Sequence, residues 1–521
     1  MDFRKLIIVI TTISAAIMEL IDASIVNVAL SHISGNLGAT IEDTSWVVTS
    51  YAIANVIIIP LTGFLAKYFG RKNYYVASMI LFTAASVMCG LSGDLWTLVF
   101  WRFIQGIGGG ALLSTSQGIL FDTFEPRQKA MAAGMFGMGI VLGPTIGPTL
   151  GGIIVENYTW PLIFFINLPF GILATFLSIR YIEKRPEEHH IDRKSIPIDY
   201  AGIALLAVGI GSLQYILEKG QSDDWFQSRT IILLTGTAVI GIVGFVWREL
   251  TAAHPAINLK IMKNWNLVGS NILTFVCGFG MFGSIFIFPV LVQRILGFSP
   301  TEAGYSLVPG ALIAIFVMPI IGKALGSGVP PLFFVVIGFI AFILHGYTSS
   351  LANIDSSRLW FTLPQVLRGL GTACLTVPLI NQAVVGLKPS EMPSGIALTN
   401  MLRQIGGALG IAIMNTYVYN HYMQHRADLV SNLSVENPLM AERLGNYKLM
   451  LLSKGYDFQA AEQAANQVLD LSVTRQAYLL SYLDGFLLIS LFFIATIPFM
   501  FLLRSQKLDK ETQAKLREEA H

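Results

Sequence analysis

Long apolar runs dominate this chain, and short polar or charged segments separate them. Most runs reach the length of about 20 residues that an α-helix needs to cross the hydrocarbon core of a bilayer. Turn and charge signals between the runs predict fourteen membrane-spanning helices. We expect these helices at residues 6–30, 45–66, 74–92, 96–121, 130–155, 161–182, 200–217, 230–247, 267–292, 304–325, 331–349, 359–387, 394–418 and 478–503.

The composition agrees with this pattern. Of the 521 residues, 54% are hydrophobic and 13% are charged, whereas soluble domains carry roughly twice that share of charge. The chain is therefore predicted to be an all-α membrane protein. A net charge of +2 without a basic cluster gives no indication of a nucleic-acid partner.

The cysteines and histidines predict neither a disulfide framework nor a metal site. Cys89, Cys277 and Cys374 all lie in apolar runs, which is typical of reduced packing residues. His421 and His425 have the i,i+4 spacing of one helix face. No third ligand is evident, so we expect two solvated side chains and no metal.

A weak internal repeat divides the chain into parts. The residues Pro-Leu-Thr-Gly at 60–63 close the second predicted helix, and Pro-Ile-Ile-Gly-Lys at 319–323 close the tenth. Arg102 and Arg368 begin similar glycine-containing motifs in the fourth and twelfth helices. Two six-helix bundles of the same orientation are therefore predicted, and such parallel repeats are typical of transporters with a substrate site between the halves. The predicted parts are 1–183 and 263–504 for the two bundles, 184–262 for a linker and two inserted helices, and 505–521 for a tail.

The distribution of charge predicts the orientation. Lysine and arginine fall mostly in the segments on the same side as the N-terminus, and the positive-inside rule makes that side cytoplasmic. Because fourteen is even, both termini are expected in the cytoplasm. The polar segment 419–477, which includes helical stretches such as 459–469, is then an external loop between the last two helices.

Two acidic residues lie near the middle of the first predicted helix. A carboxylate at the depth of Glu19 or Asp22 costs several kcal/mol unless it is paired, protonated or hydrated. The alternative is that the span is misjudged and both acids lie on a soluble helix surface, but the rest of the chain is also membrane-like. A proton or cation site is therefore favoured, with Glu19 as either a second proton site or a contact for cationic compounds.

Arg102 is a second buried charge, in the fourth predicted helix. At about 1.5 Å per residue, Asp22 lies roughly 12 Å and Arg102 about 10 Å below the outer ends of their helices. The shared depth predicts an Asp22–Arg102 pair, direct or through water. In the alternative, Arg102 bonds only to backbone carbonyls. Arg368 has a similar depth and Arg403 lies near mid-membrane, but the ninth helix has no acid, so proton chemistry is expected in the N-terminal half.

The fifth predicted helix is rich in glycine and proline. Glycines at intervals of three or four residues allow a neighbouring helix to approach closely, and prolines remove backbone hydrogen bonds and bend a helix. The pattern fits a bent packing helix, and we also expect it to form a tight seam and hinge between the two bundles. The residues concerned are Gly139, Gly143, Pro144 and Gly147.

A substrate cavity of this architecture should be apolar and adaptable, with few polar groups. Methionine and aromatic side chains suit the binding of varied ligands, although most of them are packing residues. The candidates are Asn27, Tyr51, Asn55, Met138, Phe279, Phe282, Asn381, Gln382 and Asn400.

Five motifs together resemble those of the major facilitator superfamily, and of its fourteen-span drug:proton antiporter branch, over nearly the whole chain. The loop motif after the second helix runs from Gly63 through Gly70 and Arg71 to Lys72, but Lys67 stands where an acid is usual. The others are at 20–30, 102–108, 139–147 and 164–171. The resemblance implies the major facilitator fold, with two six-helix bundles and two inserted helices. It also implies that the motifs at 63–72 and 139–147 govern the conformational change, and that the second is a mark of exporters.

The resemblance further implies a proton-coupled antiporter that exports hydrophobic or cationic toxic compounds, driven by the proton gradient without another cofactor. No Gly-x-x-x-x-Gly-Lys-Ser/Thr loop is present, which fits a transporter without its own ATPase. A dedicated exporter of one metabolite, such as a siderophore, lipid or amino-acid derivative, stays open. So does a non-transporting membrane scaffold, although the acids of the first helix argue against it. Exporters of this branch in two-membrane bacteria lie in the inner membrane and work with a periplasmic adaptor and an outer-membrane channel. The resemblance therefore implies this location and these partners for the present chain.

Overall fold

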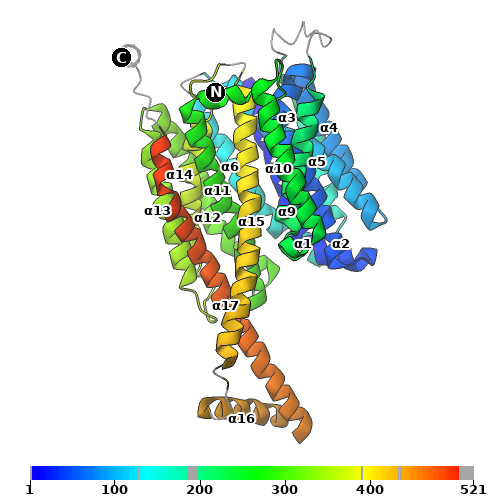
Figure 1. Cartoon of the computed structure of the whole chain (residues 1–521), viewed down its shortest axis with the longest axis vertical. Coiled ribbons are helices and arrows are strands. Elements are labelled where there is room, and N and C mark those ends of the chain that lie inside the picture. Colours follow the sequence, from blue (N-terminus) through cyan, green and yellow to red (C-terminus); the bar gives the residue numbers. More distant parts are fainter. Residues whose placement is uncertain are drawn as a thin grey trace.

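The computed structural model describes residues 3–125, 128–184, 197–388, 391–431, 433 and 437–503, and the regular structure within these ranges is helical (Figure 1). The N-terminal half contains α1 (Phe3–Leu37), α2 (Ile41–Thr44), α3 (Trp46–Phe69), α4 (Arg71–Gly90), α5 (Leu95–Thr123), α6 (Lys129–Asn157), α7 (Leu162–Phe165) and α8 (Asn167–Tyr181). The inserted segment contains α9 (Tyr200–Lys219), η4 (Trp225–Gln227) and α10 (Arg229–Thr251). The C-terminal half contains η5 (Leu259–Lys263), α11 (Trp265–Val290), η6 (Leu291–Ile295), α12 (Pro300–Gly326), α13 (Pro331–Ser350), α14 (Thr362–Gln382), α15 (Met392–Ser431), α16 (Pro438–Ser453), α17 (Phe458–Thr496) and η7 (Ile497–Leu502).

Each predicted span coincides with a long helix or with a closely spaced pair of helices. Thirteen helices of the described part are long and apolar enough to cross a membrane. The fourth predicted span, α5, has 29 residues but is not among them, because glycine, serine, threonine and glutamine lower its hydropathy. It packs against α1, α3 and α4, so its polar side chains lie inside the N-terminal bundle.

The segment 419–477, predicted as a loop with helical stretches, is mostly helical. The helix α15 continues to Ser431 and α17 begins at Phe458, so both run on beyond the bundle, and α16 lies across their far ends (Figure 1). Ion pairs between Arg426 and Asp470 and between Lys448 and Glu462 accompany these helices. The helical stretch at 459–469 agrees with the prediction, but the full extent of these helices was not predicted, because an exposed helix needs no continuous apolar face. We call this part the protruding element, residues 419–477.

Several predicted parts lie outside the described residues. They are the tail at 505–521, most of the charged linker, at 185–196, and the basic residue Arg127. The predicted orientation depends partly on these charges and stays a prediction. The three cysteines are free and buried, as expected for packing residues.

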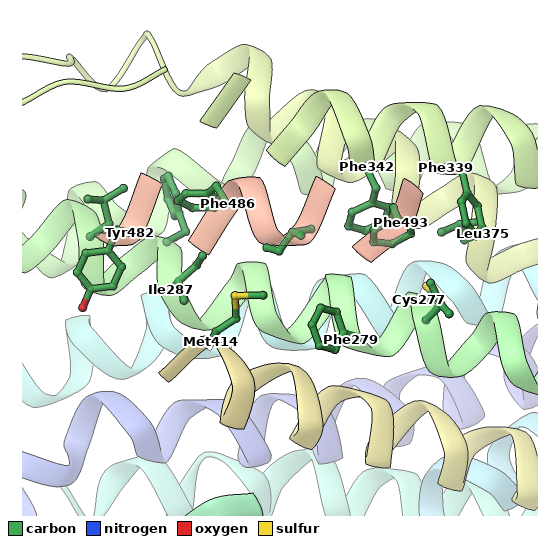
Figure 2. Packing of buried hydrophobic residues seen from close by; sticks show 14 of the residues in the cluster. Cys277, Phe279, Ile287, Phe339, Phe342, Leu375, Met414, Tyr482, Phe486 and Phe493 are labelled. Atoms are coloured by element: carbon green, nitrogen blue, oxygen red, sulfur yellow. The ribbon is translucent and has the colours of Figure 1, made fainter. Parts of the chain in front are cut away.

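Each half has its own apolar core. In the C-terminal half, Phe279, Phe342, Phe486 and Phe493 belong to one cluster of buried side chains (Figure 2). A second cluster lies between the halves and joins Leu20, Phe136 and Ile140 to Met281, Met318 and Val377. The interface between the bundles is therefore mainly apolar.

The inserted helix α9 connects the two halves. On the N-terminal side, Lys219 donates to the Glu42 carbonyl over 3.0 Å and to the Ser45 hydroxyl. On the C-terminal side, Leu217 packs with residues of α15, and the Trp225 indole donates to Thr416 over 3.0 Å. The insertion thus links α3 to α15 on the side of the molecule where α3 begins.

Candidate functional site

Asp22 of α1 is fully buried in a network of side chains from three helices, α1, α5 and α8. Its Oδ2 accepts from Arg102 Nη1 of α5 over 2.6 Å, and neither side chain is exposed. Its Oδ1 accepts from Gln105 Nε2 over 2.9 Å and from Asn167 Nδ2 over 2.7 Å. The predicted Asp22–Arg102 pair is therefore confirmed as a direct contact, and both carboxylate oxygens are hydrogen-bonded.

Arg102 is held from three further directions. Its Nε donates to the Val47 carbonyl of α3 over 3.1 Å, and Nη1 also donates to Gln105 Oε1 over 2.8 Å. The guanidinium carbon lies 4.1 Å from the centre of the Tyr51 ring, a favourable cation–π distance. A charge pair this dry is stable only with such additional partners.

Glu19 lies one turn before Asp22 and has a different environment. Its Oε1 accepts from Asn55 Nδ2 over 2.9 Å and from the Tyr51 hydroxyl over 3.2 Å. Its Oε2 is buried and has no hydrogen-bond partner in the described part of the chain. Tyr51 therefore contacts both charges, with its ring on Arg102 and its hydroxyl on Glu19.

Gly109 leaves room for this arrangement. A Cβ at this position of α5 would lie 2.6 Å from the Tyr51 hydroxyl and 3.3 Å from Glu19 Cγ. Gly106 and Gly110 similarly lie against the backbone of α3. The glycine run of α5 brings α3 close enough for Tyr51 and Asn55 to reach Glu19.

The glycines of α6 serve two contacts instead of the single seam predicted. Gly139, Gly143 and Gly147 face α1, where they contact Ile13, Ile17, Leu20 and Ser24. This contact lies within the N-terminal bundle, so the predicted inter-bundle seam is wrong for these three residues. Earlier in α6, Gly134 and Gly137 do face Met318 of the other half. The helix continues through Pro144 and Pro148, and it supports the stretch of α1 that carries both acids.

The loop motif joins helices of both halves. Gly70 has a φ of 84°, a value that favours glycine, and it lets the chain turn from α3 into α4. Arg71 forms an ion pair with Asp122 at the end of α5. A Cβ on Gly63 would lie 2.9 Å from the Ser394 hydroxyl of α15, so α3 and α15 approach closely here.

The nine predicted substrate contacts do not line one cavity. Tyr51 and Asn55 belong to the Glu19 site, and Phe279 is buried in the C-terminal core, where it stacks on Phe492 at 3.9 Å (Figure 2). For Phe279 the predicted cavity position is wrong, because apolar residues of a bundle core and of a cavity share one sequence pattern.

The remaining candidates are distributed along the helices. Met138 and Phe282 are half-buried at the apolar interface between the halves. Asn400 donates to Ser114 Oγ and Gln117 Oε1 of α5, both over 3.1 Å, and so crosses that interface. Asn27 is exposed, Asn381 is half-buried and Gln382 is buried.

The other two buried arginines lie in the C-terminal half. Arg403 of α15 is within electrostatic range of Glu19, and its Nε has no hydrogen-bond partner in the described part. Arg368 of α14 donates from Nε to Gln365 Oε1 over 2.7 Å. Within the described ranges, no acidic residue forms an ion pair with either arginine.

Gln105 and Asn167 were not predicted as partners of Asp22. Both lie inside motifs of the resemblance, the first at 102–108 and the second at 164–171. Gln105 is three residues after Arg102, so the two share a helix face. This spacing was a usable signal, whereas the approach of Asn167 depends on how α8 packs.

Two helical halves with buried charges beside their common interface are typical of multi-pass secondary transporters. Family comparison gives the same class, since the profile described as Major Facilitator Superfamily matches residues 12–411. The chain belongs to the Major Facilitator Superfamily.

Curated relatives and solved structures support this assignment. The chain is 34% identical to the multidrug export protein EmrB of Escherichia coli K12, over 84% of this chain and 85% of that protein. It is also 34% identical to the EmrB of Haemophilus influenzae over 82% of each chain. The crystal structure of the human organic anion transporter MFSD10 has a TM-score of 0.61 at 13% identity, covers 96% of this chain and 99% of that one, and shows the shared fold.

Proposed function

We propose that this protein is a proton-coupled antiporter that exports amphipathic toxic compounds by alternating access. The observation that carries the proposal is a pair of buried acids beside the interface of the halves, one of which keeps an oxygen without a partner. Buried ionisable groups in membrane helices are costly and mark ion pathways. The likeness to proteins named multidrug exporters supports this choice over a dedicated metabolite exporter.

The two acids have different roles in this proposal. Asp22 is a fixed charge, because Arg102, Gln105 and Asn167 occupy both of its oxygens. Glu19 is the proton carrier, because Oε2 has no hydrogen-bond partner in the described part of the chain while Asn55 and Tyr51 hold Oε1 in place. The sequence alone favours the opposite order, with Asp22 as the first proton site and Glu19 as the second.

A transport cycle follows from these contacts. Facing outside, Glu19 binds a proton, and facing the cytoplasm it releases that proton when the positive charge of Arg403 on α15 comes within reach. Because Arg403 belongs to the other half, rocking of the bundles changes its distance from Glu19. The proton gradient thereby drives the conformational change that exports the substrate.

We place the protein in the bacterial inner membrane, with both termini in the cytoplasm and the protruding element in the periplasm. The likeness to EmrB and the positive-inside pattern support this placement. On this basis, the protruding element is where a periplasmic adaptor would bind, followed by an outer-membrane channel. Hydrophobic and cationic compounds are the substrates first to be tested.

The experiment is drug-driven proton flux in proteoliposomes that contain the purified protein. With an imposed pH gradient, adding a panel of amphipathic drugs should dissipate the gradient faster in wild-type vesicles than in protein-free vesicles. The Glu19→Gln variant should bind the same drugs but show no drug-dependent flux. The proposal fails if no compound elicits proton flux in wild-type vesicles.

A further inference from the structure

Arg368 is a buried cation for which the described part of the chain provides no acid. Arg368 is 5% exposed. In the described part of the chain its side chain makes a single hydrogen bond, from Nε to Gln365 Oε1. An unpaired buried charge is costly, and a protein normally compensates it with a counter-charge. Arg102 forms an ion pair with Asp22, and Arg403 lies within electrostatic range of Glu19. In the described part of the chain, no acid forms an ion pair with Arg368.

Arg368 lines a small pocket between the two halves. The pocket is lined by Ile140 and Thr145 of α6, by Met281 and Ile285 of α11, and by Arg368 and Thr372 of α14. Walls from α6 on one side and from α11 and α14 on the other place the pocket at the interface that alternating access opens and closes. Its lining is apolar apart from two hydroxyls and the one charge.

The hydroxyls of this pocket are already committed as donors. Thr145 donates to the Val141 carbonyl over 2.8 Å, and Thr372 donates to the Arg368 carbonyl over 2.8 Å. The guanidinium nitrogens other than Nε have no hydrogen bond in the described ranges. The polar capacity left in the pocket is therefore that of a cationic donor, which suits a carboxylate or a similar planar anion.

A second observation strengthens the need for an acceptor. Gln365 is fully buried, and once its Oε1 has accepted from Arg368, its Nε2 has no partner in the described part of the chain. Arg368 and Gln365 together therefore leave donors without acceptors in the described part of the chain, and no acidic residue there pairs with the arginine.

We propose that Arg368 anchors the anionic head group of amphipathic substrates, while the apolar body of the substrate lies against Met281, Ile285 and Ile140. This proposal rests on the proposed export function and assigns to it a site that selects amphipathic monoanions such as aryl or alkyl carboxylates. The guanidinium selects the charge, and the interface supplies the apolar contact. Cationic compounds are excluded from this pocket by repulsion.

The test compares three probes that share one ring system and differ in the head group: 1-naphthylacetate, 1-naphthaleneethanol and 1-naphthylmethylamine. Binding to the purified full-length protein in nanodiscs is followed by naphthalene fluorescence at pH 7.5. The wild-type protein should bind the carboxylate more tightly than the alcohol and the amine. This comparison needs no variant, and equal or weaker binding of the carboxylate overturns the proposal.

Variants then locate the effect. The Arg368→Gln variant should weaken carboxylate binding by about ten- to a hundredfold, the range of a charge-assisted hydrogen bond, and leave alcohol binding unchanged. The Arg368→Lys variant keeps the charge without the planar fork, so it should fall between the two. The matched control is Arg426→Gln, which removes an arginine paired with Asp470 at 2.7 Å in the protruding element, and it should bind all probes like wild type.

Three possible results separate this proposal from the proposed function. If Arg368→Gln loses affinity for all three probes equally, the arginine is structural and the anion subsite is refuted. If carboxylate selectivity depends on Arg368 but no compound elicits proton flux, the subsite stands and the export function fails. If proton flux with cationic and neutral drugs survives in Arg368→Gln and flux with the carboxylate is lost, both are supported.

Discussion

Glu19 and Asp22 are one helical turn apart, yet the structure predicts opposite consequences for their neutral isosteres. Asp22→Asn removes the charge that balances Arg102, a side chain without solvent exposure. It also places an amide NH2 where the carboxylate accepts three hydrogen bonds. Glu19→Gln keeps the oxygen that accepts from Asn55 and Tyr51, and its new NH2 group falls where Oε2 has no partner.

These contacts fix the expected magnitudes. Removing one partner of a buried ion pair costs about 3–5 kcal/mol, because the other charge stays buried. Replacing a carboxyl by an amide that retains its hydrogen bonds changes stability by less than about 1 kcal/mol. We therefore expect Asp22→Asn to be much less stable than wild type and Glu19→Gln to be close to wild type in stability.

The assay has two parts. Thermal unfolding of the purified variants in detergent gives the order of stability, with wild type and Glu19→Gln well above Asp22→Asn. Transport in proteoliposomes then gives the function. Glu19→Gln should exchange labelled drug for unlabelled drug across the membrane, since exchange needs no proton movement, but it should fail to accumulate drug under a pH gradient. The double variant Asp22→Asn/Arg102→Gln should recover part of the lost stability, because it leaves no unpaired charge.

Either of two results would refute this reasoning. Equal melting temperatures for Asp22→Asn and wild type would show that the ion pair does not hold the bundle together. Proton-driven accumulation by Glu19→Gln at the wild-type rate would show that the proton binds elsewhere, and Asp22 would then be the remaining buried acid of α1. A double variant less stable than Asp22→Asn would show that Arg102 stabilises the bundle through its bonds to α3 alone.

Three further predictions follow from single contacts. Tyr51→Phe removes a hydroxyl from Glu19 but keeps the ring on Arg102, so it should shift the pH dependence of transport without lowering thermal stability, and a large drop in melting temperature would contradict this. Gly147→Ala places a methyl group against α1, whereas Gly236→Ala meets no atom within 4 Å, so the first should lower the melting temperature and the second should not. Trp225→Phe removes the indole hydrogen bond to Thr416 and should cost about 1 kcal/mol of stability. An unchanged melting curve would show that this hydrogen bond does not contribute to stability.

The pairing of Asp22 with Arg102 could be predicted from the sequence because two charges in apolar helices have few partners at their depth. Helix order and length were predictable for the same reason, since the bilayer sets one length for every span. The position of Phe279 was not predictable, because an aromatic residue that lines a cavity and one in a bundle core have the same apolar surroundings in sequence. In the protruding element a helical stretch at 459–469 was predicted, but the full extent of the helices was not, since nothing there requires an apolar face.

The direction of the glycines of α6 shows what else the sequence leaves open. Spacing identifies a helix face that permits close approach, but it does not identify the neighbour. Gly143 and Gly147 proved to face α1 within the same bundle, while Gly134 faces the other half. The neighbour is decided by the rotation of the helix about its axis, which depends on all of its contacts together.

This rotation matters for coupling, because α6 contacts both candidate sites. Gly143 and Gly147 pack on the stretch of α1 that carries Glu19, and Ile140 and Thr145 of the same helix line the pocket of Arg368. Direct electrostatics cannot make an anionic substrate and a proton compete, since protonating Glu19 makes the region more positive and favours the anion. Exchange of an anion for a proton therefore needs a mechanical connection, in which the position of α1 alters the pocket. A helix that is closely packed on one side and lines the pocket on the other provides that connection.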